Sequence, residues 1–146
     1  MINSHSGCDG WTVDQARAFL KEALKIEKEV GIPIAHETHR RRIFWNPYNL
    51  RDIFKGASGL DDVKVTLDIS HWVCCLERCF ASKESLKENG PDDWWPEVLK
   101  FCKKHVFLTH ARVGYGEGPQ VADPSADEYK AEVNAHMDWW AEIMKA

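Results

Sequence analysis

Three runs of apolar, often β-branched residues each end in a short cluster of polar side chains. The runs cover residues 32–35, 63–67 and 106–109, and the clusters that follow them cover 36–39, 68–71 and 110–112. Runs of this kind are typical of buried parallel strands. In parallel α/β folds, ligands bind at the carboxyl ends of the strands. The sequence therefore predicts that the clusters meet at one edge of a sheet, where Glu37, Asp68 and His110 would offer oxygen and nitrogen ligands to a metal ion.

Length and charge limit the class of protein. With 146 residues the chain is long enough for one domain with a real core, expected to span residues 1–146. A net charge of −4 gives no basic surface, so we expect neither nucleic acid nor a membrane as a partner. The N-terminus lacks a basic segment followed by an apolar one, and the five cysteines form no C-x-x-C motif. These features favour a cytoplasmic protein with reduced thiols.

Helix signals lie between the expected strands. Thr12 and Gln15 form a capping box at the start of the first helix, and Gly31 ends it. Asn46 caps a second helix, with Pro47 at its first position, and this helix is expected to stop near residue 56.

The second half of the chain contains three more helix signals. Helices are expected over residues 72–86 and 92–104, separated by a break at 89–91. A capping box of Ser125 and Glu128 is expected to begin the last helix. The residues expected on the buried face of that helix are Tyr129, Val133, His136, Trp140 and Ile143.

The order of these elements predicts the fold class. With a short strand around Ile2, about four strands alternate with helices, which is typical of an α/β fold with a parallel sheet and right-handed crossovers. A closed eight-stranded barrel needs about 250 residues. The chain is therefore expected to be a small open α/β domain or part of a (β/α)8 TIM barrel.

Five motifs, in order along the chain, resemble a known family. They are NSHSG at 3–7, HETHR at 36–40, DISHW at 68–72, HARVG at 110–114 and GPQ at 118–120. This pattern resembles the xylose-isomerase-like TIM-barrel family, the sugar phosphate isomerase and epimerase group, which is related to the endonuclease IV barrels. The resemblance implies a partial barrel that covers about the fourth to the seventh strand and is incomplete at both ends.

The resemblance also implies a chemistry. Its members hold a divalent metal ion such as Mn²⁺, Zn²⁺ or Mg²⁺ by a Glu, an Asp, a His and a second Glu from successive strand ends. Glu37, Asp68 and His110 match the first three ligands, whereas the strand that carries the last Glu is not among the 146 residues. The ion polarises a carbonyl and a hydroxyl of a small carbohydrate-like substrate, and a carboxylate, here Glu37, moves a proton through an enediolate.

Four further residues are expected to bind the substrate. His71, three residues after Asp68, matches a substrate-binding position, and Arg112 matches a polar group that faces the substrate. His39 and His5 are expected at the same opening of the substrate pocket, at the carboxyl ends of the strands. His36 is expected to line the pocket or to support a ligand.

Each metal-ligand assignment has an ordinary structural alternative. Glu37 could be an exposed loop carboxylate, and His110 a core histidine. Asp68 could cap the helix that follows it, a task that Ser70 can also perform.

Two other functions stay open. One is a metal-dependent phosphodiester hydrolase like endonuclease IV, which needs two or three metal ions and a basic face, and the charge of −4 disfavours it. The other is a truncated, non-catalytic remnant. Open sheet edges in a partial barrel also predict that the chain associates with itself or is only marginally stable.

Overall fold

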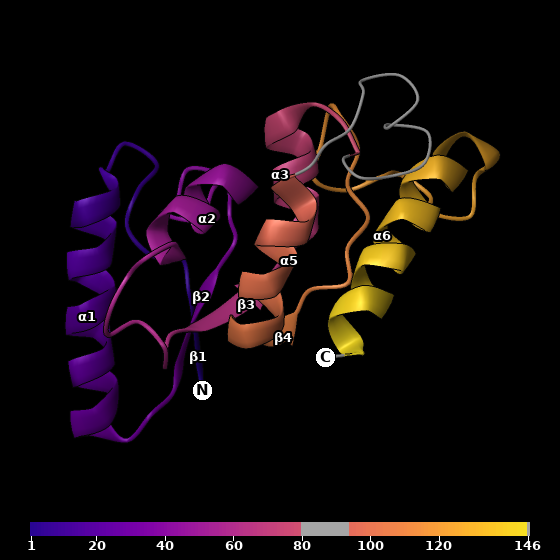
Figure 1. The fold of residues 1–146 in the computed structure, drawn as a ribbon. Helices are drawn as coiled ribbons and strands as arrows, with labels where there is room; N and C mark the ends of the chain where they lie inside the picture. The colour runs from indigo at the N-terminus through magenta and orange to yellow at the C-terminus, as the bar shows by residue number, and fades with distance from the viewer. Residues whose placement is uncertain (80–93, 146) are drawn as a thin grey trace.

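A four-stranded parallel sheet forms the centre of the molecule (Figure 1). The computed structural model describes residues 1–79 and 94–145. The strands are β1 (Ile2–Ser4), β2 (Ile34–Glu37), β3 (Lys64–Leu67) and β4 (Val106–Thr109), and they pair in the order β1-β2-β3-β4. The predicted α/β fold with four parallel strands is therefore confirmed. In the described residues the sheet is open, with β1 and β4 at its edges.

Helices follow each strand in turn. They are α1 (Val13–Val30), α2 (Pro47–Phe54), α3 (Ile69–Leu76), α5 (Trp94–His105) and α6 (Lys130–Met144). The capping box of Thr12 and Gln15 is present, and Gly31 ends α1 in the left-handed conformation with φ of 73°. The Asn46 side chain caps α2. These helix ends could be predicted from the sequence because the capping residues bond backbone groups of their own helix, without help from the rest of the fold.

The later helices differ from the prediction. α3 begins at Ile69, three residues earlier than expected, and ends at Leu76, where Glu77 adopts φ of 55°. The predicted continuation beyond residue 79, the break at 89–91 and the expected start at 92–93 lie outside the described residues.

The prediction that Ser125 and Glu128 form a capping box is wrong. The amide and hydroxyl of Ser125 donate to Asp123 Oδ1 instead, at 2.8 and 2.7 Å. A short 3₁₀ turn, η1 (Asp127–Tyr129), follows, and α6 begins only at Lys130. The buried face differs in part from the prediction: α6 buries Ala135, His136, Trp139 and Ile143, whereas Val133 and Trp140 are only partly buried.

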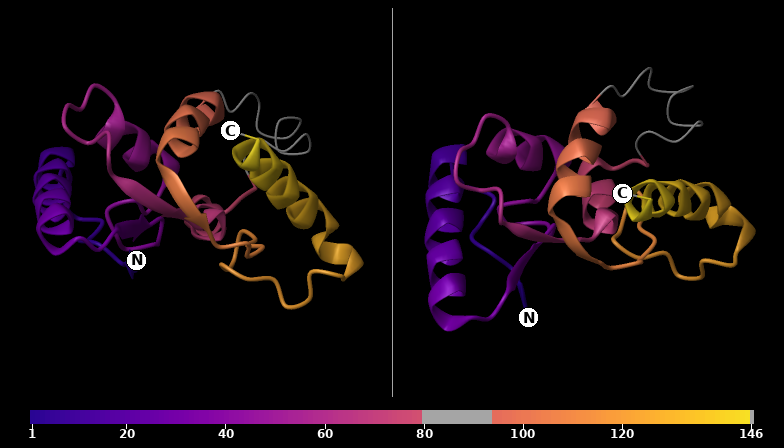
Figure 2. Two further views of the ribbon diagram at one scale, coloured as in Figure 1. Left: turned by 90° about the horizontal axis from the view of Figure 1, so that it is seen from below. Right: turned by 60° about the horizontal axis from the view of Figure 1, so that its bottom comes forward.

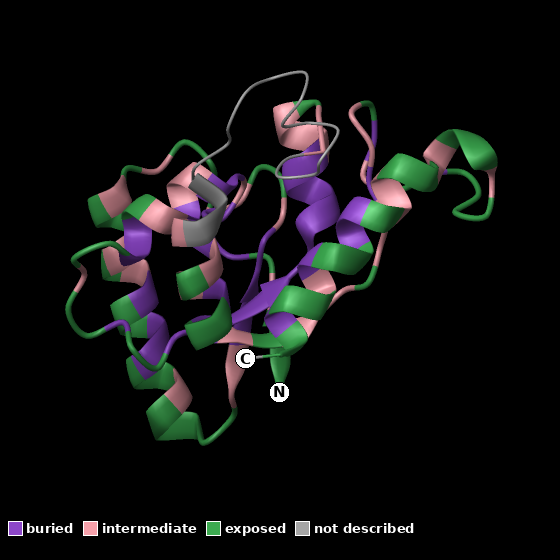
Figure 3. Cartoon of the chain, turned by 45° about the vertical axis from the view of Figure 1, so that its right-hand side comes forward, coloured by how far each residue is buried: buried purple, intermediate pink, exposed green. Residues whose placement is uncertain are grey.

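One face of the sheet carries the hydrophobic core. Val65 and Leu67 of β3 belong to a buried cluster to which every helix in the described part contributes. The burial colours in Figure 3 show this as purple segments on the sides of the helices and strands that face each other. Because side chains alternate along a strand, Thr66 and Asp68 point to the opposite face. α1 and α6 lie at opposite ends of the molecule in both views of Figure 2.

A bulge interrupts the pairing of β3 with β4. Val65 is paired with Val106, but its neighbour Thr66 is paired with Leu108, so Phe107 has no partner on β3. Phe107 is 56% exposed.

None of the described helices is both long enough and apolar enough to cross a lipid bilayer. All five cysteines are free thiols, as expected.

Candidate metal centre

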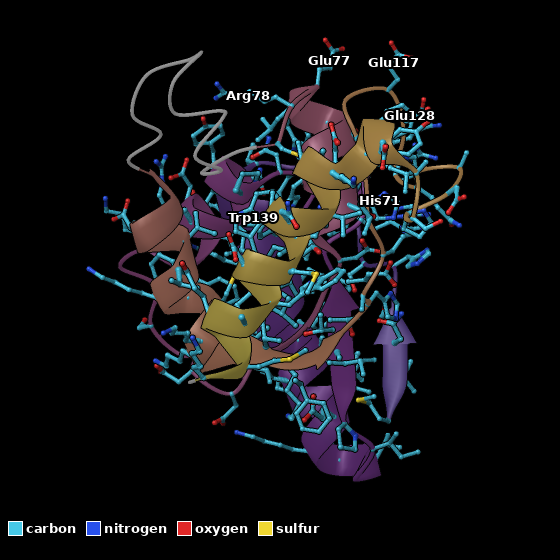
Figure 4. All side chains as sticks on the ribbon, turned by 90° about the vertical axis from the view of Figure 1, so that its right-hand side faces the viewer. His71, Glu77, Arg78, Glu117, Glu128 and Trp139 are labelled. Atoms are coloured by element: carbon cyan, nitrogen blue, oxygen red, sulfur yellow. The ribbon has the colours of Figure 1, made fainter. Side chains whose placement is uncertain are left out.

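A polar cavity opens where the four strands end. Its volume is about 440 Å³, and it is lined by Asn3, His5, Glu37, His39, Asp68, His71, His110 and Arg112. These residues come from the carboxyl ends of all four strands and from the segments that follow them. All seven site residues predicted from the sequence line this one cavity. Figure 4 labels His71, which lies deeper in the molecule than Glu77 and Glu117, whose side chains point outward.

Backbone pairing continues past the strand ends and aligns the three expected metal ligands. The Thr38 amide donates to the Thr66 carbonyl (3.0 Å), and the His110 amide donates to the Leu67 carbonyl (2.9 Å). Thr38 Oγ1 accepts from the Asp68 amide (2.7 Å) and donates to the Asp68 carbonyl (2.9 Å). The fully buried Thr38 therefore fixes the end of β2 against the end of β3.

Glu37, Asp68 and His110 converge on one point. His110 Nδ1 lies 3.7 Å from Glu37 Oε1 and 3.8 Å from Asp68 Oδ2, and the three ligand atoms all lie within 4.8 Å of one another. These separations are slightly wider than the roughly 3.4 Å between ligands of a tetrahedral site with bonds of about 2.1 Å. The Glu37 and Asp68 side chains are only 5% and 2% exposed. The predicted convergence is confirmed, and two buried carboxylates beside an imidazole fit a divalent cation.

The two carboxylate oxygens of Asp68 have different partners. Oδ1 accepts from the amide of Ser70 (3.1 Å) and from its hydroxyl, so Asp68 caps α3, which was the structural alternative to a metal role. Oδ2 faces Glu37 and His110 and accepts from Arg112 Nη2 at 2.7 Å. Burial raises the pKa of Asp68, as does nearby Glu37, and the bond from Ser70 and the charge of Arg112 oppose this rise. One residue therefore both caps a helix and faces the site.

Three imidazoles lie in contact along the cavity wall, with their ring planes tilted against one another. The ring centroids of His5 and His39 are 4.3 Å apart, and those of His39 and His71 are 3.9 Å apart. Burial, with the nearby cationic groups, lowers the pKa of His71 to about 3. His71 Nε2 lies 2.7 Å from Arg112 Nη2, which can only donate, so Nε2 accepts and the ring proton is on Nδ1. This Nδ1 is buried and has no hydrogen-bond partner among the described residues.

A second group of potential metal ligands shares Glu37. It consists of His5, Glu37 and His39. Glu37 Oε2 contacts His5 Nε2 at 3.2 Å, while Oε1 faces His110. One carboxylate is thus placed between two sets of ligands.

The prediction for His36 is wrong. Its side chain is buried away from the cavity, with Nδ1 2.6 Å from Ser6 Oγ and the ring against Phe19 of α1. The reason is strand alternation: His36 directly precedes Glu37 in β2, so their side chains point to opposite faces.

Two functional contacts were missed at the sequence level. Asn3 Nδ2 donates to Glu37 Oε2 at 2.5 Å, and Thr38 bonds the Asp68 backbone as described above. Asn3 is two residues before His5, so the same alternation predicts that both face the cavity. For Thr38 no local signal exists, because its partner is 30 residues away.

The loop after Arg112 is hydrogen-bonded to α6. His136 Nε2 accepts from the Gly114 amide (3.2 Å), and its Nδ1 donates to the Glu132 carbonyl (2.8 Å). Gly114 packs so closely that a Cβ there would lie 2.7 Å from the Ser70 carbonyl oxygen. The segment that carries Arg112 is therefore fixed between α3 and α6.

Comparisons of the chain with protein-family models, curated proteins and solved structures found no match.

Proposed function

We propose that this chain is a metal-dependent isomerase or epimerase domain that acts on a small sugar, sugar phosphate or polyol-derived ketone. The convergence of Glu37, Asp68 and His110 in one polar cavity is the observation that carries the proposal. A bound Mn²⁺, Zn²⁺ or Mg²⁺ would polarise the carbonyl and the neighbouring hydroxyl of the substrate. A cavity of about 440 Å³ suits a small molecule, and its polar lining suits one with many hydroxyl groups.

Each residue of the cavity has a role in this proposal. Glu37 is the group that takes and returns the proton on carbon, while Asn3 and His5 bond its Oε2 and fix its orientation. His71, Arg112 and His39 line the same space and would contact the substrate.

Proton transfer at carbon tests this function directly. The protein would be incubated in D₂O with each metal ion and a panel of ketoses, sugar phosphates and inositol-derived ketones. We expect deuterium to enter the position next to the carbonyl of at least one substrate, as measured by NMR. Glu37→Gln should slow this exchange by about a hundredfold or more, because it removes the base. Glu29→Gln, on the exposed end of α1, is the matched control and should leave exchange unchanged. Exchange that survives in Glu37→Gln would contradict the role of Glu37.

A (β/α) barrel is the finer fold that we propose with this function. Four parallel strands, helices packed on one face and polar residues at the carboxyl strand ends all support it. In such a barrel further strands would pair with the edges that β1 and β4 form in the described chain.

The open edges lead to a prediction about this 146-residue chain. Ile2 on β1 and Phe107 on β4 are 49% and 56% exposed, and unpaired edges favour association with other strands. We expect self-association that increases with protein concentration, measured by analytical ultracentrifugation. Phe107→Lys should shift the chain toward monomer, whereas Met144→Lys, on an exposed position of α6, should not. A monomer at every concentration would refute the prediction.

A second candidate function is a phosphodiester hydrolase of the endonuclease IV type. The ligand group of His5, Glu37 and His39 favours it, because it would place a second metal ion beside the first with Glu37 between them. The net charge of −4 disfavours a nucleic acid substrate. Two bound ions per chain, with hydrolysis of a simple aryl phosphodiester and no exchange at carbon, would favour this function over the first.

A further inference from the structure

Arg112 is hydrogen-bonded to the oxygen of Asp68 that faces the proposed metal site. Asp68 has two carboxylate oxygens, and Oδ1 is committed to Ser70 at the start of α3. Oδ2 is the one that faces Glu37 and His110, and Arg112 Nη2 lies 2.7 Å from it. The guanidinium therefore binds the atom that a metal ion would need.

The remaining contacts of Arg112 hold it in this position. Its Nε donates to Ser70 Oγ at 3.0 Å, and Nη2 also donates to His71 Nε2 at 2.7 Å. These partners lie on the first turn of α3, and the Arg112 side chain is 32% exposed. The cation is thus well ordered but remains open to the cavity on one side.

The geometry points to an exchange of cations at Asp68: Arg112 pairs with Oδ2 in the metal-free protein, and a divalent ion displaces it. This inference rests on the proposed metal site and adds an order of events to it. Before the ion binds, Arg112 offsets the charge of the buried Asp68 carboxylate, which alone would be costly to bury. After the ion binds, the same carboxylate is neutralised by the metal instead.

The charge balance then indicates the class of ligand. Three residues that line the cavity are formally charged at neutral pH: Glu37, Asp68 and Arg112. A divalent ion balances the two carboxylates, so the charge of Arg112 is left without a partner at the cavity wall. A released guanidinium binds phosphate or carboxylate well because it presents paired donors. Metal uptake would therefore turn the cavity into a site for an anionic substrate, such as a sugar phosphate or sugar acid.

The alternative is that Arg112 supports the metal site. A carboxylate oxygen can accept a hydrogen bond and bind a metal at the same time, and such partners normally strengthen metal binding. The two models predict opposite signs for the loss of Arg112.

Metal titration distinguishes the two models. Mn²⁺ and Zn²⁺ affinities would be measured by calorimetry for the parent chain, Arg112→Met and Arg40→Met. Arg40 is the matched control because it is another arginine near His71, but its guanidinium donates to Cys74 Sγ. We expect Arg112→Met to bind metal about tenfold to a hundredfold more tightly, since no charge-assisted bond must be broken first. Arg40→Met should change affinity much less.

Two results would overturn the exchange while leaving the metal site intact. One is weaker metal binding by Arg112→Met, which would make Arg112 a supporting group. The other is an equal gain in metal affinity for Arg112→Met and Arg40→Met, which would reflect only the loss of a nearby positive charge. If neither the parent nor Arg112→Met binds metal, the proposed metal site itself is wrong.

Two further measurements test whether Arg112 is released when the metal ion binds. In the parent chain, Mg²⁺ or Zn²⁺ should move the NMR signal of the Arg112 Nε–H group, which is bonded to Ser70 before the ion binds. Inorganic phosphate should bind the metal-loaded parent chain more tightly than metal-loaded Arg112→Met. An unmoved Nε–H signal in a chain that has bound metal, or equal phosphate binding by both, would contradict release of the arginine.

Discussion

Replacing His110 with alanine is expected to abolish binding of Mn²⁺, Zn²⁺ and Mg²⁺ while leaving the fold intact. His110 is one of three residues in a group that could hold a metal ion, and a three-ligand site that loses one ligand binds a divalent ion much more weakly. The side chain is 38% exposed, so its loss creates no buried cavity. Calorimetry and thermal unfolding of the variant would separate loss of the ion from loss of structure.

The second ligand needs a more conservative substitution. Asp68→Ala would also remove the cap of α3, which typically costs about 1 kcal/mol. Asp68→Asn keeps the oxygen that caps α3 but removes the charge and the acceptor for Arg112, so it should lose metal binding while the helix cap remains. Asp61→Asn, before the amino end of β3, removes an exposed carboxylate and serves as the control. Unchanged metal affinity in both His110→Ala and Asp68→Asn would refute the proposed centre.

Acid should destabilise the protein through His136. Burial lowers the pKa of this histidine from 6.5 to about 4. As the pH falls, His136 takes up a proton in the unfolded chain before it does so in the folded one. The contribution of His136 to the stability of the fold is therefore complete above about pH 6.5 and is lost as the pH falls toward 4. A shift of this size corresponds to about 3 kcal/mol. We expect the free energy of unfolding, measured in urea, to fall by at least this much across that range, because burial also lowers the pKa of His36 to about 4 and that of His71 to about 3.

A comparison of variants isolates this contribution. His136→Gln should be less stable than the parent near neutral pH, and the difference should shrink toward pH 4, because glutamine does not titrate. Met137→Gln places the same side chain on an exposed position of α6 and should follow the pH profile of the parent. A constant difference between the parent and His136→Gln at all pH values would show that the histidine has only a packing role.

The site was predictable to the extent that it depends on strand direction. Parallel neighbours end at the same edge, so Glu37, Asp68 and His110 could be placed together without knowing a single distance. The error at His36 came from treating a polar cluster as one unit, although alternate residues of β2 face opposite sides. Arg112 was expected to face the substrate, but its bond to Asp68 depends on side chains 44 residues apart, which no local pattern reveals.

The fold was predictable where helix ends are satisfied locally. The side chains of Thr12 and Asn46 each accept from a backbone amide three residues further along the chain. At Ser125 a competitor lies two residues away: Asp123 takes both the amide and the hydroxyl, so the apparent capping box does not form. Sequence reasoning identifies the donors and acceptors at such a position but not which of two arrangements has the lower free energy.

The unpaired Phe107 decides which way His110 points. Leu108 is paired with Thr66 because one residue of β4 is skipped, and the His110 amide continues that pairing at Leu67. If β4 paired regularly with β3, Phe107 would lie opposite Thr66, every later side chain would turn to the other face, and the imidazole of His110 would enter the hydrophobic core instead of the cavity. The chemistry of this edge therefore depends on the register of β4 as well as on the identity of its residues. A shift of this register would alter the site more than most single substitutions.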